Sequence, residues 1–158
     1  MFPPRHFILS NTNAVINLTN TTLNYGSNKL LTVSGNSGEW GTSGSNGGTV
    51  TLNANKQTLT GDITVDNIST ATLKLKSSTL TGTINSANSA KAVNVSLNGS
   101  STWNVTGDSY VTKLTLKNND TSLIKDNGHT IYYDASANSW LNGQTITLSN
   151  GGKLTPAN

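Results

Sequence analysis

The sequence contains no cysteine and little charge, and these two deficits narrow the kinds of protein it can encode. Without cysteine, no disulfide scaffold can form. Charged residues make up 11% of the 158 residues, against a usual share of about 25%. The net charge is only +3 and the lysines are scattered, whereas a nucleic-acid-binding protein would more often carry a basic patch with interleaved aromatic residues. We therefore expect no nucleic-acid partner.

Long apolar stretches are also missing. Hydrophobic residues make up 33% of the chain, and no run of them approaches the roughly 20 residues that a membrane-spanning helix needs. We expect no membrane insertion. The start of the chain, residues 1–7, lacks the apolar core of a signal peptide. We therefore expect no signal peptide in this sequence, and we expect residues 1–7 to be a disordered or vector-derived start.

Small polar residues take the place of the missing types. The chain contains 25 Thr, 23 Asn, 19 Ser and 15 Gly, which together make up just over half of it. These residues are mediocre or poor helix formers, so a helical fold is disfavoured. Absence of cysteine, low charge and abundant Asn, Thr and Ser are typical of exported bacterial surface proteins. We expect the protein to be secreted or located at the cell surface.

A short motif recurs along the chain and predicts its fold. The motif is an alternating apolar–polar run, followed a few residues later by a Thr- and Gly-containing run. Its anchor leucines are spaced 23, 22 and 19 residues apart, and we expect them to share one inward stack on adjacent rungs: Leu52, Leu75, Leu97 and Leu116. Weaker copies precede and follow them, at residues 16–23 and 146–148. Strict alternation indicates strands with one buried face, and the Asn, Ser, Asp and Gly between them favour turns.

Strands this short bury enough apolar surface only if successive copies stack. The repeat therefore predicts an all-β, single-domain parallel β-helix of about six to seven coils over residues 8–158. A Gly-rich loop at 34–48 would protrude from it, either as a functional loop or as an insertion without a role, and a cap would begin at about residue 132. The alternative is an antiparallel β-sandwich, because Asn-Gly pairs such as Asn98-Gly99 and Asn142-Gly143 also suit hairpins.

The repeat pattern resembles the right-handed parallel β-helix of bacterial surface proteins, namely adhesins and autotransporter passengers, and more loosely that of pectate lyases. Residues 101–110, 128–134 and 140–143 resemble the ends of secreted β-helix proteins, some of which are labelled carbohydrate-binding. The resemblance implies a right-handed β-helix at the cell surface and a polysaccharide or surface glycan as partner. It supplies no catalytic motif, because the matching residues are structural in character.

Candidate catalytic groups are few. A glycosidase needs two carboxyl groups across the scissile bond, and a serine hydrolase needs a nucleophile with a base. An enzyme on this scaffold, whether a glycoside hydrolase, polysaccharide lyase or esterase, would draw on a small set of residues: Asp62, Asp66, Asp108, Ser109, His129 and Asp134. It would have to bring at least two of them together in a groove. The competing interpretation is that Asp beside Gly is turn chemistry.

Aromatic side chains favour binding over catalysis. Exposed Trp and Tyr rings stack on sugars while amides, hydroxyls and carboxylates bond to sugar hydroxyls. Tyr132 and Tyr133 must point to opposite sides of a strand, so one of them should lie outside. The candidate ligand-binding residues are Trp40, Tyr110 and Tyr133. Trp103 occupies the repeat position of Leu59 and Leu80 and is expected in the core.

These observations lead to one function with two alternatives. We expect an extracellular polysaccharide-binding or adhesion module; the alternatives are the hydrolase or lyase above and a purely structural stalk segment of a larger surface protein. No cofactor is expected, although a column of aspartates could hold Ca²⁺. Exposed strand edges at the ends of a solenoid predict end-to-end self-association, so a homo-oligomer is a further expectation.

Overall fold

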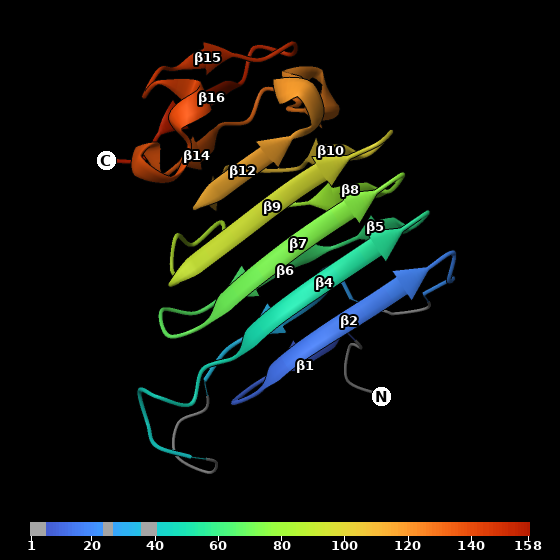
Figure 1. Cartoon of the computed structure of the whole chain (residues 1–158), viewed down its shortest axis with the longest axis vertical. Coiled ribbons are helices and arrows are strands. Elements are labelled where there is room, and N and C mark those ends of the chain that lie inside the picture. The colour runs from blue at the N-terminus through green and yellow to red at the C-terminus, as the bar shows by residue number, and fades with distance from the viewer. Residues whose placement is uncertain (1–5, 24–26, 36–40) are drawn as a thin grey trace.

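The computed structural model describes residues 6–23, 27–35 and 41–158 and is an all-β solenoid of about six turns. Strands of successive turns pair in parallel, and the turns pile up along the long axis (Figure 1). Parallel pairing confirms the predicted fold class and excludes the sandwich. In the described part of the chain no helix reaches seven residues, and none could cross a membrane.

The solenoid has three sides. The first side is a five-stranded sheet of β2 (Asn13–Thr19), β4 (Thr49–Asn55), β7 (Thr70–Lys76), β9 (Ala92–Asn98) and β12 (Lys113–Leu116). The second side is a four-stranded sheet of β5 (Thr58–Thr60), β8 (Thr79–Gly82), β10 (Thr102–Val105) and β13 (Ile124–Lys125). Short 3-10 turns η1 (Lys117–Asn119) and η2 (Thr121–Leu123) lie between β12 and β13.

The third side is divided between two sheets. One contains β1 (Phe7–Leu9), β3 (Lys29–Val33) and β6 (Asp62–Val65), and the other contains β11 (Ser109–Val111), β14 (Ile131–Tyr133), β16 (Lys153–Pro156) and the antiparallel β15 (Ile146–Thr147). Ile84 joins them, because it forms a bridge with Ile63 and accepts a hydrogen bond from the Tyr110 N–H.

Alternation along each strand fills the interior. In β4, the side chains of Val50, Leu52 and Ala54 are buried, while the threonines and asparagines between them lie outside. The second side places Leu59, Leu80, Trp103 and Ile124 on successive rungs. Trp103 is completely buried and donates its indole N–H to the Gly82 carbonyl at 3.0 Å. The expectation that Trp103 is a core residue is therefore confirmed.

The register differs from the one that the leucine spacing predicted. Leu52 pairs with Leu73, and Leu75 pairs with Leu97 but lies opposite Ala54. The repeat from Leu52 is thus 21 residues, not the predicted 23. A slip of two residues returns a strand to the same face, so alternation alone could not distinguish the two alignments. Placing Leu52 and Leu75 in one column was therefore wrong, although both leucines are core residues.

Left-handed residues form the corner between the first and second sides. The residue that follows each of the first four strands of this sheet, β2, β4, β7 and β9, has positive φ: Asn20 (46°), Lys56 (53°), Ser77 (48°) and Gly99 (64°). Asn and Gly adopt this conformation at low cost. The conformation turns the chain sharply at the same height in each rung, and this accounts for part of the high Asn and Gly content.

Buried hydroxyl groups complete the pairing at the corners, where strands end and backbone groups lack partners. The side chain of Ser78 accepts a hydrogen bond from the Gln57 N–H at 3.0 Å, and that of Ser69 accepts one from the Gly48 N–H at 3.0 Å. In each pair the hydroxyl belongs to one turn and the amide to the turn before it. Unpaired buried amides are costly, so these serines stabilise the stacking.

The two ends of the solenoid differ. At the C-terminal end, η3 (Ala135–Ala137) and η4 (Ser139–Leu141) cover β12, as Figure 1 shows. Asn138 accepts the Leu114 N–H at 2.8 Å and Trp140 donates its indole N–H to the Leu114 carbonyl at 3.0 Å. At the N-terminal end, β2 is the last strand of the first sheet. There the inward-facing Ile16 and Leu18 are only partly buried.

The Gly-rich loop joins β3 to β4 and is fastened at both of its ends. The Gly35 N–H donates to Asp66 at 2.7 Å, and the Gly48 N–H donates to Ser69. Residues 36–40 lie outside the described part of the chain. Phe7 already belongs to β1, so regular structure starts one residue before the expected boundary.

The central stack provides a test of the fold. Replacement of Leu73, which is completely buried between Leu52 and Val95, by Ala should lower the free energy of unfolding by about 3 kcal/mol, because it removes apolar contacts and leaves a cavity. Thr72→Ala on the outer side of the same strand should change it by less than about 0.5 kcal/mol. Urea unfolding followed by circular dichroism measures both. Equal effects would contradict the described core.

Candidate functional site

Two tyrosine rings stack on the outer surface of the third side. Tyr110 in β11 and Tyr132 in β14 are directly opposite each other in the parallel ladder. Their ring centroids are 4.5 Å apart and the ring planes differ by 13°. This separation is close to the spacing between paired strands, about 4.8 Å, so pairing of the backbone places the rings in contact. Both side chains are partly exposed, and together they form the tyrosine pair.

A shallow hollow lies beside the tyrosine pair. Its volume is about 120 Å³, and its lining includes Asn88, Thr112 and Asp134 together with both rings. Sites that enclose a small molecule usually measure about 300–1,000 Å³. A sugar ring therefore cannot be enclosed here, and any ligand would have to lie across the surface, in contact with the rings.

The rung next to Tyr110 leaves the hollow open. Asn85 lies there, with its backbone in the left-handed conformation (φ 50°). Its side-chain oxygen accepts from the N–H groups of Ser89 and Ala90, at 3.0 and 3.1 Å, and its amide donates to the Tyr110 carbonyl at 3.3 Å. The Asn85 side chain is therefore bonded to backbone groups and has no ring that could continue the stack. Tyr110 is the last ring of the tyrosine pair in this direction.

Asp134 supplies a negative charge at the edge of the hollow. Its Oδ1 accepts from the Ser136 hydroxyl at 2.6 Å and from the Ser136 N–H at 2.8 Å. These two bonds hold the pKa of Asp134 below its ordinary value. The carboxylate is exposed and ionised at neutral pH, and both of these bonds involve Oδ1. Oδ2 can therefore accept a hydrogen bond from a ligand hydroxyl.

The structure places one of the predicted binding residues, Tyr133, in the core instead of on the surface. Tyr133 is completely buried, and its hydroxyl donates to the Gln144 carbonyl at 2.7 Å. Tyr133 therefore cannot present its ring to a ligand, and the outward ring of the two is Tyr132. The neighbouring Ile131 could have indicated this, because residues 131 and 133 share one face of the strand. Tyr110 lies on the surface as expected, and Trp40 lies outside the described residues.

The candidate carboxylates are separated rather than gathered. Asp62 accepts from the Thr83 N–H at 2.9 Å, and Asp108 accepts from the Thr130 N–H at 2.9 Å. The rung of residues 83–84 lies between Asp62 and Asp108, which places their backbones about 10 Å apart. Asp66 accepts from the Gly35 N–H. Each of these aspartates thus bonds to a backbone amide of another turn.

Ser109 and His129 do not form a nucleophile–base pair. The Ser109 side chain is completely buried. It accepts from the Ile84 N–H at 3.0 Å and donates to the Gly107 carbonyl at 3.1 Å. Ser109 is therefore one of the buried corner hydroxyls. His129 is partly exposed on the adjacent rung. Within residues 6–23, 27–35 and 41–158, no three His, Asp or Glu side chains gather as a metal site would require.

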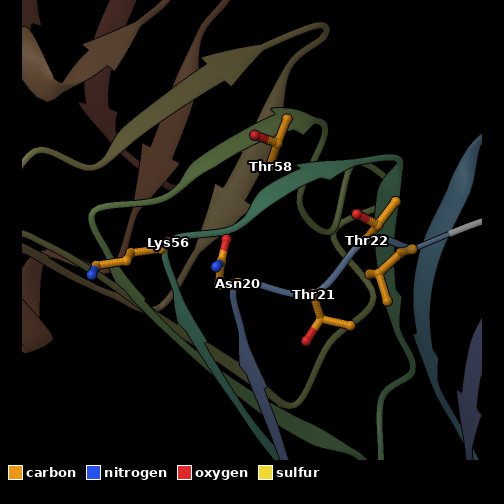
Figure 2. Close-up of a pocket in the computed structure, with 6 residues that line it drawn as sticks. Asn20, Thr21, Thr22, Lys56 and Thr58 are labelled. Atoms are coloured by element: carbon orange, nitrogen blue, oxygen red, sulfur yellow. The ribbon is translucent and has the colours of Figure 1, made fainter.

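Two other hollows lack aromatic residues in their linings. One, of about 250 Å³, lies at the N-terminal corner and is lined by Asn20, Thr21, Thr22, Leu23, Lys56 and Thr58. Figure 2 shows that the side chains of Thr21 and Thr58 extend in opposite directions and that Lys56 extends away from them. The other, of about 230 Å³, lies on the outer face of the first sheet, between Lys74 and Lys113. These two hollows therefore offer polar groups to a ligand but no aromatic ring for stacking.

The sequence analysis did not single out Asp126, although in the part of the chain that the structure describes this carboxylate accepts three backbone N–H groups. Asp126 is completely buried. Its oxygens accept from the N–H groups of Asn150, Gly152 and Gly128, at 2.9, 2.7 and 3.0 Å. A Cβ at Gly152 would lie 2.0 Å from the His129 carbonyl oxygen, so only glycine permits this approach. Asp126 therefore binds the C-terminal segment to the last full turn.

Comparisons with protein-family models, with curated proteins and with solved structures gave no match.

The contacts of Asp126 predict a pH-dependent contribution to stability. Burial by itself would raise the pKa of Asp126, but the backbone N–H bonds lower it more, so the net pKa lies below its ordinary value of 3.8. The folded state therefore binds this proton less readily than the unfolded state. The stabilisation is complete above the unfolded pKa and is lost as the pH falls through the folded pKa.

Asp126→Asn should lower the free energy of unfolding at pH 7 by about 2 kcal/mol, because an amide group replaces one acceptor oxygen. Urea titrations at pH 7, 5, 4 and 3 measure the free energy of unfolding of the variant and of the original protein. The difference between these two free energies should become smaller below about pH 4. Asp120→Asn is the matched control, since Asp120 is exposed and its side-chain bonds go to Ser122 alone. A difference for Asp126→Asn that stays constant from pH 7 to 3 would contradict this role.

Proposed function

We propose that the protein is an extracellular polysaccharide-binding or adhesion module and that the tyrosine pair is its contact with the sugar. The observation that carries the proposal is the stacked, partly exposed Tyr110 and Tyr132 beside an open polar hollow. A sugar ring presents an apolar face of C–H groups and a rim of hydroxyls. Aromatic side chains bind the first, and carboxylates and amides bind the second.

The form of the surface favours a polymer over a free monosaccharide. The hollow is too small to enclose a sugar. The two rings lie on successive rungs and therefore follow each other along the axis of the solenoid. An extended polysaccharide chain could continue past them along the third side. In this arrangement one sugar unit contacts the exposed surfaces of both Tyr110 and Tyr132. Asn88 and Asp134 then bond to hydroxyls of that unit or of its neighbour.

Three observations favour binding over hydrolysis. Asp62 and Asp108 are separated by an intervening rung, Asp66 is bonded to the Gly-rich loop, and the Ser109 hydroxyl is buried against backbone groups. Four of the six candidate catalytic groups are therefore used to join turns of the solenoid: Asp62, Asp66, Asp108 and Ser109. The exported or cell-surface location and the kinship with adhesins remain parts of this proposal, supported by the composition and the repeat.

Replacement of the outward ring tests the proposal. Tyr132→Ala should weaken binding to a polysaccharide about tenfold, because it removes a stacking surface worth about 1.4 kcal/mol. Affinity electrophoresis in gels containing pectin, xylan or soluble cellulose derivatives measures this change, after a glycan array has identified a ligand. Tyr132→Phe, which keeps the ring, should lose less than threefold.

Tyr133→Phe is the matched control, since it removes one buried hydroxyl from the adjacent position. It should lower stability while leaving the affinity for the polysaccharide unchanged. Failure of the array to reveal any glycan, or equal affinities for the original protein and Tyr132→Ala, would refute the proposed site. Hydrolysis of a polysaccharide that is abolished by Asp108→Asn or Ser109→Ala would establish the enzymatic alternative instead.

A further inference from the structure

Among residues 6–23, 27–35 and 41–158, no element covers the outer strand edge at the N-terminal end of the solenoid. β2 is the terminal strand of the five-stranded sheet, and β4 is its neighbour on one side. Two of the described hydrophobic residues at this end are largely exposed, Ile8 at 63% and Val15 at 64%. The inward-facing Ile16 is only partly buried, whereas its partner on the next rung, Leu52, is 1% exposed.

This edge lacks the features that normally prevent strands from pairing with other molecules. Exposed edges usually carry lysine, proline, an inward-pointing charge or a bulge. β2 has the sequence Asn-Ala-Val-Ile-Asn-Leu-Thr, with no charge and no proline, and all seven residues pair with β4 in unbroken register. The opposite end of the same sheet is closed, because the side chains of Asn138 and Trp140 bond to β12.

We propose that the free edge of β2 pairs with the same edge of a second copy, which makes the protein a head-to-head dimer. The closed C-terminal end excludes head-to-tail stacking through this sheet, so the N-terminal end can meet only another N-terminal end. Such a contact is isologous, with a two-fold axis, and it stops at two copies. A two-fold axis across the solenoid makes the two β2 strands antiparallel.

The backbone groups of β2 suit this arrangement. The Thr12 carbonyl accepts from the Thr49 N–H, and the Asn20 N–H donates to the Asn55 carbonyl. Because successive residues of a strand direct their N–H and C=O groups to opposite edges, even-numbered residues bond to β4. Val15 and Asn17 therefore direct theirs to the free edge.

The side chains of β2 also suit a two-fold axis through Ile16. This register is the one that pairs all seven residues of both strands. It places Val15 opposite Asn17 of the partner subunit, as a hydrogen-bonded pair. On the inner face it sets Ala14 opposite Leu18 of the partner subunit, so a small side chain meets a large one. The apolar interior then continues from one copy into the other.

The oligomeric state tests the proposal directly. Sedimentation velocity at increasing protein concentration should show a reversible monomer–dimer equilibrium. Val15→Lys places a charge on the free edge and should raise the dimer dissociation constant at least tenfold. Thr51→Lys is the matched control, because Thr51 pairs with Val15 one rung inward and also faces outward; it should leave the dissociation constant unchanged.

Val15→Pro gives a second test that leaves the monomer intact. It removes an N–H on the free edge and no hydrogen bond to β4, so the circular dichroism spectrum should be retained while the dimer is lost. A folded protein that stays monomeric at all concentrations would overturn the proposal. A dimer that survives both Val15→Lys and Val15→Pro would overturn it as well, since the contact would then lie elsewhere.

Single cysteines can report the register, because the chain has none of its own. Ile16→Cys lies opposite its own copy, with Cα atoms about 4.5 Å apart in a non-hydrogen-bonded pair, within the range for a disulfide. Under mild oxidation it should cross-link as a dimer. Val15→Cys lies about 7–8 Å from its copy and should cross-link poorly, although residue 15 is more exposed. Faster cross-linking of Val15→Cys would refute the register.

Discussion

Hydrogen bonding between successive turns is the interaction on which the structure depends. Along the strands, parallel backbone pairing satisfies the amides and fixes the height of each rung. At the corners, strands end and side chains take over. The Ser69, Ser78 and Ser109 hydroxyls accept N–H groups of the preceding turn, and the Asp62 carboxylate accepts an N–H group of the following turn. Because the backbone groups are hydrogen-bonded throughout, a narrow apolar core is enough to stabilise the fold of a chain with only 33% hydrophobic residues.

The same constraint connects the candidate catalytic residues with the fold. A carboxylate or hydroxyl that bonds to the backbone of another turn is fixed in orientation and has little freedom to act on a substrate. Asp62, Asp66, Asp108 and Ser109 are all of this kind. The tyrosine pair differs from them because its members contribute nothing to pairing at a corner. Their rings project from paired strands, and the 4.5 Å separation follows from the ladder beneath them.

The ends of the solenoid show what happens when a turn has no successor. At the C-terminal end, Asn138 and Trp140 supply the bonds that another strand would have made to Leu114. At the N-terminal end, β2 keeps the alternating pattern of an interior strand while its outer edge lacks a covering strand among residues 6–23, 27–35 and 41–158. A second copy with the same edge offers both the backbone partners and the apolar surface that the first lacks.

The sequence by itself determined the all-β class, the repeat of about twenty residues and the core position of Trp103, because alternation and recurrence are properties of the chain. It favoured parallel stacking over the antiparallel sandwich, and the observed strand pairing decided between them. Three features were decided only by the tertiary structure. The register between Leu52 and Leu73 was hidden because a shift of two residues preserves alternation. The stacking of Tyr110 on Tyr132 and the bonds from the Asn150 and Gly152 N–H groups to Asp126 depend on which rungs become neighbours. Spacing along the chain does not specify contacts between residues more than twenty positions apart.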